Sequence, residues 1–412
     1  MYHLNNMKIN HLIKQSKSWF KEHWRGFVVT IIIGCLATIT LGLQINTLID
    51  GQNKFETITL EHLQNFPNPT ERMINAPYLV PAYIVGTIAD NMLLGARATS
   101  VIFGLLATVV LFMLLKRWFT TQIASVGSLL FVTSSWVLAV SHQATPLILL
   151  IITPLLLLVS LTKYVNAKQH VYASFLLLVA SLALAAYVPF MFWPIIVVLG
   201  AMSYLYRHKL QQLSKKQILI AAGLYALLLV PMLISVTQYP GQLKELIGIP
   251  TMILPDVTTY AKNFLWQFST LFFVAQPFPE LYVGSLALLD IFSVAMVFLG
   301  IYHFVKYMPK RRKVSFAFLV IVLAFVVPLS TIYQIPMTAY IPIIYILIAS
   351  GVYELLRQWF SYFPRNPIAR NSAVVIVAIL IGLATLYNLQ RFYIAWPNAP
   401  ETKAVYMVQS NK

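Results

Sequence analysis

Charged residues are scarce in this chain of 412 residues, and cysteine is nearly absent. Asp, Glu, Lys and Arg make up 10% of the sequence, compared with about 25% in a typical soluble domain. Apolar types make up 59%, so a soluble fold could not cover its own core with a polar surface. The composition therefore excludes soluble enzymes and disordered chains, and it predicts an integral membrane protein.

Several sequence motifs are also missing. The single cysteine, Cys35, excludes an intramolecular disulfide framework and a cysteine metal cluster. There is no Walker phosphate loop, dinucleotide glycine fingerprint, His-Glu-x-x-His motif or Gly-x-Ser-x-Gly motif, so ATP-driven transport and zinc proteolysis have no support. The formal charge of +17 would suit nucleic acid, but most of it is explained below by membrane orientation. We therefore expect no nucleic-acid partner.

Apolar stretches long enough to span a membrane follow one another along the chain. One helical span needs about 20 apolar residues. We identify eleven such stretches, at residues 26–45, 94–115, 122–141, 145–162, 172–188, 189–205, 217–236, 283–305, 314–334, 337–355 and 372–389. They predict an all-α fold with about 11 transmembrane helices, in a polytopic membrane domain over residues 26–390.

The charges between these stretches predict the orientation. With the N-terminus in the cytosol, the inner segments hold 21 of the 29 Lys and Arg residues, as the positive-inside rule requires. Ten of the 12 acidic residues lie at or near the outer face. We predict a multi-pass protein of the plasma membrane with a basic cytosolic N-terminus at 1–25. Two long extracytoplasmic loops, 46–93 and 237–282, and an extracytoplasmic tail at 391–412 complete the map.

Two acidic residues directly follow the first predicted span. Asp50 and Glu56 lie in the segment LIDGQNKFETITLEH, and a turn at Gly51 would let both carboxylates face a site at the membrane surface. A carboxylate at the membrane surface can remove a proton from an acceptor hydroxyl or hold a divalent cation. The alternative for each residue is a solvated loop acid.

Cationic side chains also gather near the outer face. Arg97 stands at the mouth of the second span, where a cation is costly unless it is paired. It could bind a lipid phosphate, and the alternatives are snorkelling to headgroups or pairing with Asp90. His142 at the end of the third span and Lys262 in the second outer loop are further candidates for phosphate contacts. Asp290, near the top of the eighth span, has either a functional role or a role in helix packing.

The region 46–165 resembles the GT-C superfamily of polytopic glycosyltransferases, and it is most similar to bacterial relatives of the protein mannosyltransferases. The matching positions are Arg97, Ser100, Phe103-Gly104, Lys116-Arg117 and Ser135-Trp136. The segment NAPYLVPAYI resembles the Pro-containing stretch that precedes the arginine in this family. Beyond residue 165 the likeness is one of architecture, with an inside N-terminus and two long outer loops.

This resemblance implies an activity and a set of partners. Family members transfer a sugar from a polyprenyl-phosphate donor on the extracytoplasmic side, and an acidic residue of the first outer loop acts as base or metal ligand. Glu56 best fits that role and Asp50 is second, while Arg97, with His142 or Lys262, would neutralise the donor phosphate. Leu147 stands where a second acid is usual, so a divalent cation is possible but no metal ligand is assigned. The other partners would be membrane lipids and an acceptor that is a glycan, a lipid or a protein.

Two other functions remain open at this stage. Loss of the acid at Leu147 allows a GT-C-like protein without catalysis, which binds a lipid-linked sugar or supports a partner protein. A transporter of lipid or small solute is the third hypothesis, although the sequence shows neither paired half-repeats nor recurrent broken helices. Catalysis requires that Glu56, Arg97 and the second outer loop converge on one outer-facing site.

Overall fold

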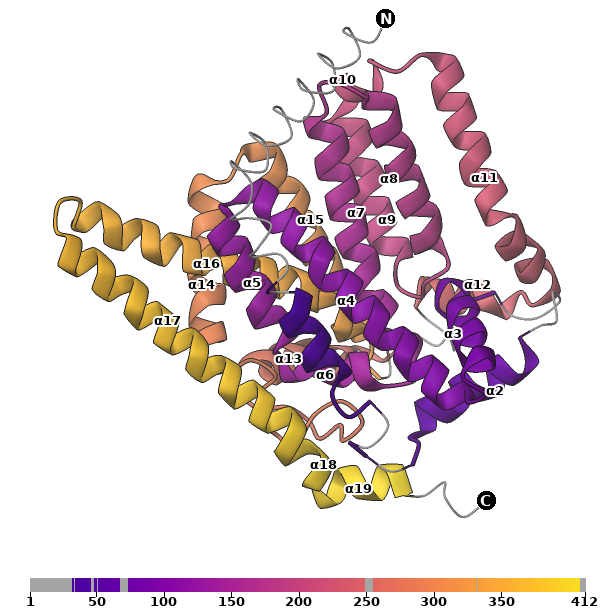
Figure 1. The fold of residues 1–412 in the computed structure, drawn as a ribbon. Helices are drawn as coiled ribbons and strands as arrows, with labels where there is room; N and C mark the ends of the chain where they lie inside the picture. Colours follow the sequence, from indigo (N-terminus) through magenta and orange to yellow (C-terminus); the bar gives the residue numbers. More distant parts are fainter. Residues whose placement is uncertain are drawn as a thin grey trace, which may run out of the picture.

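A computed structural model describes residues 32, 34–45, 48–49, 51–66, 73–248, 255–330 and 332–407 of the chain (Figure 1). Within these ranges the protein is helical, and the pairing of Val274 with Leu286 is an isolated β-bridge. The prediction of an all-α fold is therefore confirmed for this part of the chain.

Six helical stretches are long and apolar enough to cross a membrane. They are α4 (Met92–Trp118), η1 with α7 (Pro146–Asn166), α11 (Lys215–Gln238), α15 with η3 (Lys310–Leu329), η4 with α16 (Pro336–Tyr362), and α17 with η5 and α18 (Pro367–Asn398). A seventh crossing results if α5 (Thr121–Val132) and α6 (Ser135–His142), which meet at an angle of 59°, count as one span. The eleven predicted spans are thus not all confirmed.

The remaining described helices are shorter. Four are apolar: α3 (Ala76–Ile88), α8 (Val171–Ala186), α9 with the π-helical segment η2 (Phe192–Leu205), and α14 (Ile291–Tyr307). The others are α2 (Lys54–Asn65), α10 (Arg207–Leu210), α12 (Gly241–Ile247), α13 (Val257–Phe272) and α19 (Pro400–Met407). In Figure 1, α2, α3, α18 and α19 lie at one end of the bundle and α10 lies at the other.

Burial differs strongly among the long helices. α7 and α16 are buried along most of their apolar length, whereas α11 and α17 expose most of theirs and lie at opposite margins of the bundle (Figure 1). Exposed leucines such as Leu219, Leu227, Leu383 and Leu386 cover the outward faces of α11 and α17. Such apolar outer faces suit a hydrocarbon environment, because lipid tails are as apolar as the side chains they meet.

Helices α14 and α16 approach each other until their backbones touch. A Cβ atom added to Gly300 would lie 2.0 Å from the carbonyl oxygen of Leu347, and one added to Gly351 would lie 2.0 Å from that of Met296. Small residues at a crossing allow this approach, which is typical of helix packing in membranes. The two glycines therefore fix the distance between these central helices.

The predicted spans differ from the observed helices at identifiable points. The predicted span 283–305 begins as a helix only at Ile291, because Asp290 caps α14 by accepting from the backbone amide of Ser293 at 2.9 Å. The predicted span 122–141 bends between α5 and α6. The first predicted span, 26–45, is described at residue 32 and over 34–45, and within it 34–42 are helical.

Candidate functional site

Glu56 lies in the first turn of α2, where the local sequence Asn-Lys-Phe-Glu forms a capping box. The Asn53 side chain accepts from the backbone amide of Glu56 at 2.9 Å, and the amide of Asn53 donates to Glu56 Oε2 at 3.2 Å. This reciprocal arrangement satisfies amide groups that would otherwise lack partners at a helix start. The Glu56 side chain is thereby held in one orientation and is completely buried.

Arg97 of α4 forms a bidentate ion pair with the same carboxylate. Its Nε atom lies 3.0 Å from Glu56 Oε1, and its Nη2 atom lies 3.1 Å from Oε2. The guanidinium also donates to the carbonyl oxygen of Gly51 at 2.9 Å. Arg97 is only 5% exposed, so it is paired within the protein and does not snorkel to headgroups. Its partner is Glu56, whereas Asp90 is exposed in the turn before α4.

The Glu56 carboxylate accepts two hydrogen bonds at each oxygen. Besides Arg97 and Asn53, the backbone amide of Ala144 donates to Oε1 at 2.8 Å. An ion pair removed from water depends on such additional donors, because desolvation otherwise cancels the attraction between the charges. In this conformation the carboxylate has no lone pair directed at an outside group.

The residues that match the GT-C pattern on α4 lie on one face of that helix. Arg97, Ser100 and Gly104 follow the i, i+3, i+7 spacing of a helical face. Ser100 Oγ donates to the carbonyl oxygen of Gln143 at 2.6 Å. A Cβ atom on Gly104 would come within 2.7 Å of Ser141 Oγ. This face therefore docks the end of α6 and the turn after it against α4, which brings the Ala144 amide to Glu56.

The C-terminal segment covers the ion pair. Tyr406 of α19 is buried, and its hydroxyl accepts from Asn53 Nδ2 at 2.9 Å. Its carbonyl oxygen would lie 2.3 Å from a Cβ atom on Gly51, whose φ of 97° also favours glycine. Trp396 and Tyr406 line a cavity of about 20 Å³ beside Glu56 and Arg97, which has room for about one water molecule.

Burial also changes the protonation of Tyr406. Burial, with a smaller contribution from the neighbouring Glu56 carboxylate, raises the pKa of the Tyr406 phenol well above its ordinary value. The hydroxyl therefore stays protonated across the physiological range and serves as a neutral hydrogen-bonding group.

The segment 237–282, predicted as the second outer loop, also reaches this site. Gln143 Nε2 donates to the carbonyl oxygen of Glu280, and Trp396 Nε1 donates to that of Pro279 at 2.8 Å. The ring of Phe278 packs on Phe55 of α2 with centroids 6.1 Å apart. The structure therefore brings Glu56, Arg97 and the segment 278–280 together at one end of the bundle.

The other predicted site residues have different surroundings. Both ring nitrogens of His142 contact backbone carbonyl oxygens, Nδ1 that of Leu138 at 2.9 Å and Nε2 that of Leu43 at 3.1 Å, although the side chain also lines the small cavity. Lys262 is exposed on α13 and is not among the residues that line this cavity. Asp50 lies outside the described residues.

A divalent cation does not fit the Glu56 carboxylate as the structure shows it. Arg97 already supplies the positive charge there, so a cation would have to displace the guanidinium. Among the described residues, which leave out Asp50, no three His, Cys, Asp or Glu side chains are grouped closely enough to hold a metal ion.

Sequence reasoning missed the aromatic cover and the Ala144 amide. The segment 391–407, predicted only as an outer tail, is helical and buries Phe392, Trp396 and Tyr406. The aromatic residues in this short polar segment were the available signal, because buried aromatic rings contribute large apolar contact areas. A backbone amide, in contrast, leaves no trace in side-chain patterns.

Comparisons with known proteins identify the fold. No family model and no curated protein matches the sequence. Among solved structures, the chain is similar to the archaeal oligosaccharyltransferase AglB from Archaeoglobus fulgidus in complex with an inhibitory peptide and a dolichol-phosphate. The TM-score is 0.55 at 15% identity, over 92% of this chain and 56% of that one. AglB belongs to the GT-C superfamily of glycosyltransferases.

Two further structures of the Archaeoglobus fulgidus oligosaccharyltransferase give the same result. The form tethered to an acceptor peptide has a TM-score of 0.55 at 15% identity, over 93% of this chain and 56% of that one. The apo form has a TM-score of 0.53 at 16% identity, over 93% and 57%. The chain thus spans little more than half the length of these proteins. The resemblance to GT-C proteins is confirmed at the level of the fold.

Proposed function

We propose that this protein is a membrane glycosyltransferase that moves a sugar from a polyprenyl-phosphate donor to an acceptor on the extracytoplasmic face of the cell membrane. The observation that carries the proposal is the buried pair of Glu56 and Arg97 within a GT-C fold. Glycosyl transfer from such a donor needs a cation for the leaving phosphate and a base for the acceptor, and the pair supplies one of each.

The pair has to open before either side chain can act. We infer that the donor phosphate competes with Glu56 for Arg97, because a guanidinium binds phosphate and carboxylate in the same bidentate way. Once the phosphate holds Arg97, the carboxylate loses its strongest partner and becomes available to the acceptor. Donor binding would therefore create the base, which prevents proton abstraction in its absence.

The transfer step then follows. Glu56 takes the proton of the acceptor hydroxyl, and the oxygen attacks the anomeric carbon of the donor sugar. The bond between that carbon and the phosphate oxygen breaks with both electrons going to the phosphate. Arg97 stabilises the polyprenyl phosphate that leaves. Lys262 and His142 remain secondary candidates for phosphate contacts, and Asp50 remains the secondary candidate for the base.

The decisive experiment measures turnover directly. Purified protein in membranes would be incubated with a panel of polyprenyl-phosphate sugars, and released polyprenyl phosphate would be quantified. Arg97→Ala should weaken donor binding about tenfold to a hundredfold, since a charge-assisted hydrogen bond contributes roughly 1.5–3 kcal/mol. Arg97→Lys, which keeps the charge without the planar fork, should fall between.

A matched control is available on the same helix. Arg117, exposed at the other end of α4, carries the same charge without a place in the site. Arg117→Ala should bind donor like the unaltered protein. Unchanged donor affinity in Arg97→Ala, or an equal loss in Arg117→Ala, would remove Arg97 from the donor site.

A second candidate function has its own supporting observation. Leu147 provides no second carboxylate, and every lone pair of Glu56 is already engaged. These features favour a protein that binds a lipid-linked sugar, or supports a partner, without transferring it. Saturable binding of one donor in the panel with no polyprenyl phosphate released, across a range of acceptor glycans, lipids and peptides, would establish this alternative.

A further inference from the structure

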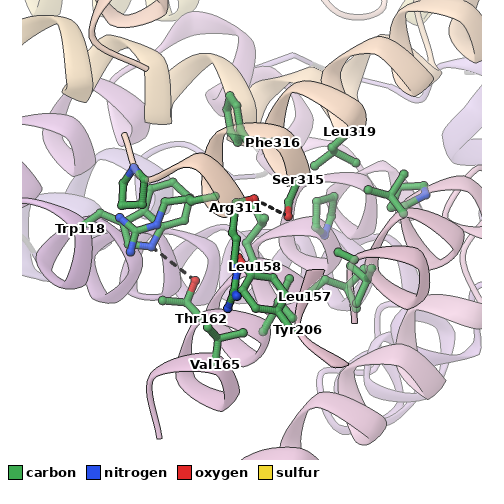
Figure 2. A pocket seen from close by; sticks show the side chains of 18 of the residues that line it. Trp118, Leu157, Leu158, Thr162, Val165, Tyr206, Arg311, Ser315, Phe316 and Leu319 are labelled. Atoms are coloured by element: carbon green, nitrogen blue, oxygen red, sulfur yellow. Dashed lines mark hydrogen bonds between the residues drawn. The ribbon is translucent and has the colours of Figure 1, made fainter. Parts of the chain in front are cut away.

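A second cavity, of about 250 Å³, lies among the ends of α4, α7, α9 and α15 (Figure 2). α4 connects it to the ion pair, because Arg97 is in the second turn of this helix and Trp118 is its last residue. At a rise of 1.5 Å per residue, these positions are roughly 30 Å apart. That distance is close to the thickness of the hydrocarbon core, so the two sites would face opposite surfaces of a membrane that α4 crosses.

The interior of this cavity is apolar. Leu157 and Leu158 of α7, Val197 and Val198 of α9, and Phe316 of α15 contribute to its walls. Its volume is below the roughly 300–1,000 Å³ of pockets that enclose a drug-sized ligand. A cavity of this size and composition suits one segment of a hydrocarbon chain, with the rest of the molecule in the bilayer.

The rim of the cavity is cationic. Arg311 and Arg312 both line it, and Arg312 lies over the Trp118 ring with 4.7 Å between its Cζ atom and the ring centroid (Figure 2 labels Trp118 and Arg311). The half-buried Arg312 donates from Nη1 to Met308 Sδ over a long distance of 3.7 Å. Arg311 contacts His208, itself a basic residue, at 3.3 Å. Within the described part of the chain, no carboxylate pairs with either arginine.

Guanidinium groups without acidic partners at the mouth of an apolar cavity indicate an amphiphilic anion. A soluble anion would leave the walls empty, and a neutral lipid would leave the arginine donors unmatched. The positive charge of neighbouring segments, including Lys209, Lys310 and Lys313, attracts anionic headgroups to the same surface.

We propose that this cavity binds one anionic phospholipid of the bilayer, with its phosphodiester on Arg311 and Arg312 and one acyl chain between α7, α9 and α15. The occupant is a bilayer lipid and not the sugar donor, whose proposed site is at the opposite end of α4. The lipid would join α15 to α7 and α9. This inference does not depend on the proposed glycosyltransferase activity.

The test counts lipids on the intact protein. Full-length protein, purified in detergent, would be titrated with phosphatidylglycerol or phosphatidylcholine of the same acyl chains, and bound lipid would be measured by native mass spectrometry. The unaltered protein should hold one phosphatidylglycerol at least tenfold more tightly than phosphatidylcholine. The double change Arg311→Gln with Arg312→Gln should reduce that preference about tenfold or more.

Two further variants keep the test decisive. Leu158→Trp leaves both arginines and fills the apolar wall, so it should lose the bound lipid even if the double arginine variant folds poorly. Lys215→Gln with Lys216→Gln removes the same charge from exposed residues outside the cavity and should retain the lipid.

Three results would overturn the proposal. The first is equal retention of the two lipids, and the second is equal loss in the lysine and arginine variants, which would indicate diffuse attraction. The third is displacement of phosphatidylglycerol by a much tighter-binding polyprenyl phosphate, which would assign the cavity to donor chemistry.

Discussion

Each end of the helix bundle contains a buried carboxylate, but the two are held in different ways. The Glu354 carboxylate of α16 accepts hydrogen bonds from Arg357, through Nε at 2.9 Å and Nη2 at 2.7 Å. Gln358 donates to it at 2.7 Å, and His303 Nδ1 lies 2.8 Å from Oε2. Two of these partners are one turn away on the same helix. Glu56, in contrast, draws its partners from the residue that precedes α2, from α4 and from the turn after α6.

The partners of Glu354 come mainly from its own helix, whereas the partners of Glu56 come from segments that are distant in the sequence. Arg357 and Gln358 meet Glu354 within α16 itself, because residues three and four apart are neighbours on a helix, and His303 joins them from α14. The Arg357 side chain is 37% exposed and can turn to water. The pair of Glu56 and Arg97 exists only when several distant segments have packed, and both side chains are buried. Under the proposed function, the pair of Glu56 and Arg97 is the one that donor binding would open.

The largest expected effect is a difference in the side of the membrane from which two introduced cysteines can be labelled. In a background where Cys35 is replaced by serine, Lys54→Cys near Glu56 and Lys310→Cys beside the second cavity should react with an impermeant maleimide from opposite sides. Both lysines are exposed, so accessibility does not decide the result. Labelling of both positions from one side would refute the orientation and the separation of the two sites.

The next effect concerns turnover. Glu56→Gln keeps the shape of the side chain and removes the charge that accepts the proton, so the transfer rate should fall about 10²–10⁴-fold, the typical contribution of a general base. Donor binding should persist. The loss of a partner for the buried Arg97 should also lower the free energy of unfolding by roughly 3–5 kcal/mol. Transfer at the unaltered rate would pass the role of base to Asp50 or another outer acid.

The same substitution at the other end provides the contrast. Glu354→Gln should lower the free energy of unfolding by about 3 kcal/mol, at the low end for a broken buried pair because Arg357 can reach water. Turnover per folded molecule should not change. Thermal unfolding and the transfer assay, performed on one preparation, separate the two effects, and a parallel loss of turnover would show that the ends are coupled.

The smallest effect concerns the aromatic cover. Tyr406→Phe removes the acceptor for Asn53 Nδ2 and should cost about 1 kcal/mol of stability. Because burial raises the pKa of the Tyr406 phenol well above its ordinary value, the phenol does not ionise near neutral pH. The pH profile of turnover should therefore have the same shape in Tyr406→Phe. A pH step that disappears in this variant would show that the phenol takes part in proton transfer.

Much of the helical architecture could be predicted from apolar runs alone. The predicted span 94–115 lies within α4, and 217–236 lies within α11. The predicted span 283–305 starts eight residues before the helix does, because hydropathy carries no information about backbone hydrogen bonds between segments. Residues before Ile291 are held by hydrogen bonds to α13, such as that from the Leu288 amide to the carbonyl oxygen of Thr270 at 2.9 Å.

The candidate site could be predicted only as a set of separate residues. Glu56 and Arg97 were identifiable because ionisable groups near a span mouth are costly unless they are used. Their pairing was not identifiable, because it depends on where the loop from Gly51 to Glu56 packs against α4. Asp90 was the nearer choice in sequence, yet its backbone adopts a φ of 51° in an exposed turn. Sequence distance is therefore a poor guide to ion pairs built from loops.

The four hydrogen bonds to Glu56 also have a consequence for isotope exchange. The carboxylate shields two backbone amide protons, that of Asn53 at Oε2 and that of Ala144 at Oε1. Amide protons exchange with deuterium when the groups that protect them move away. Departure of this one side chain therefore exposes two protons that are far apart in the sequence, and their deuterium uptake rises together whenever the ion pair opens.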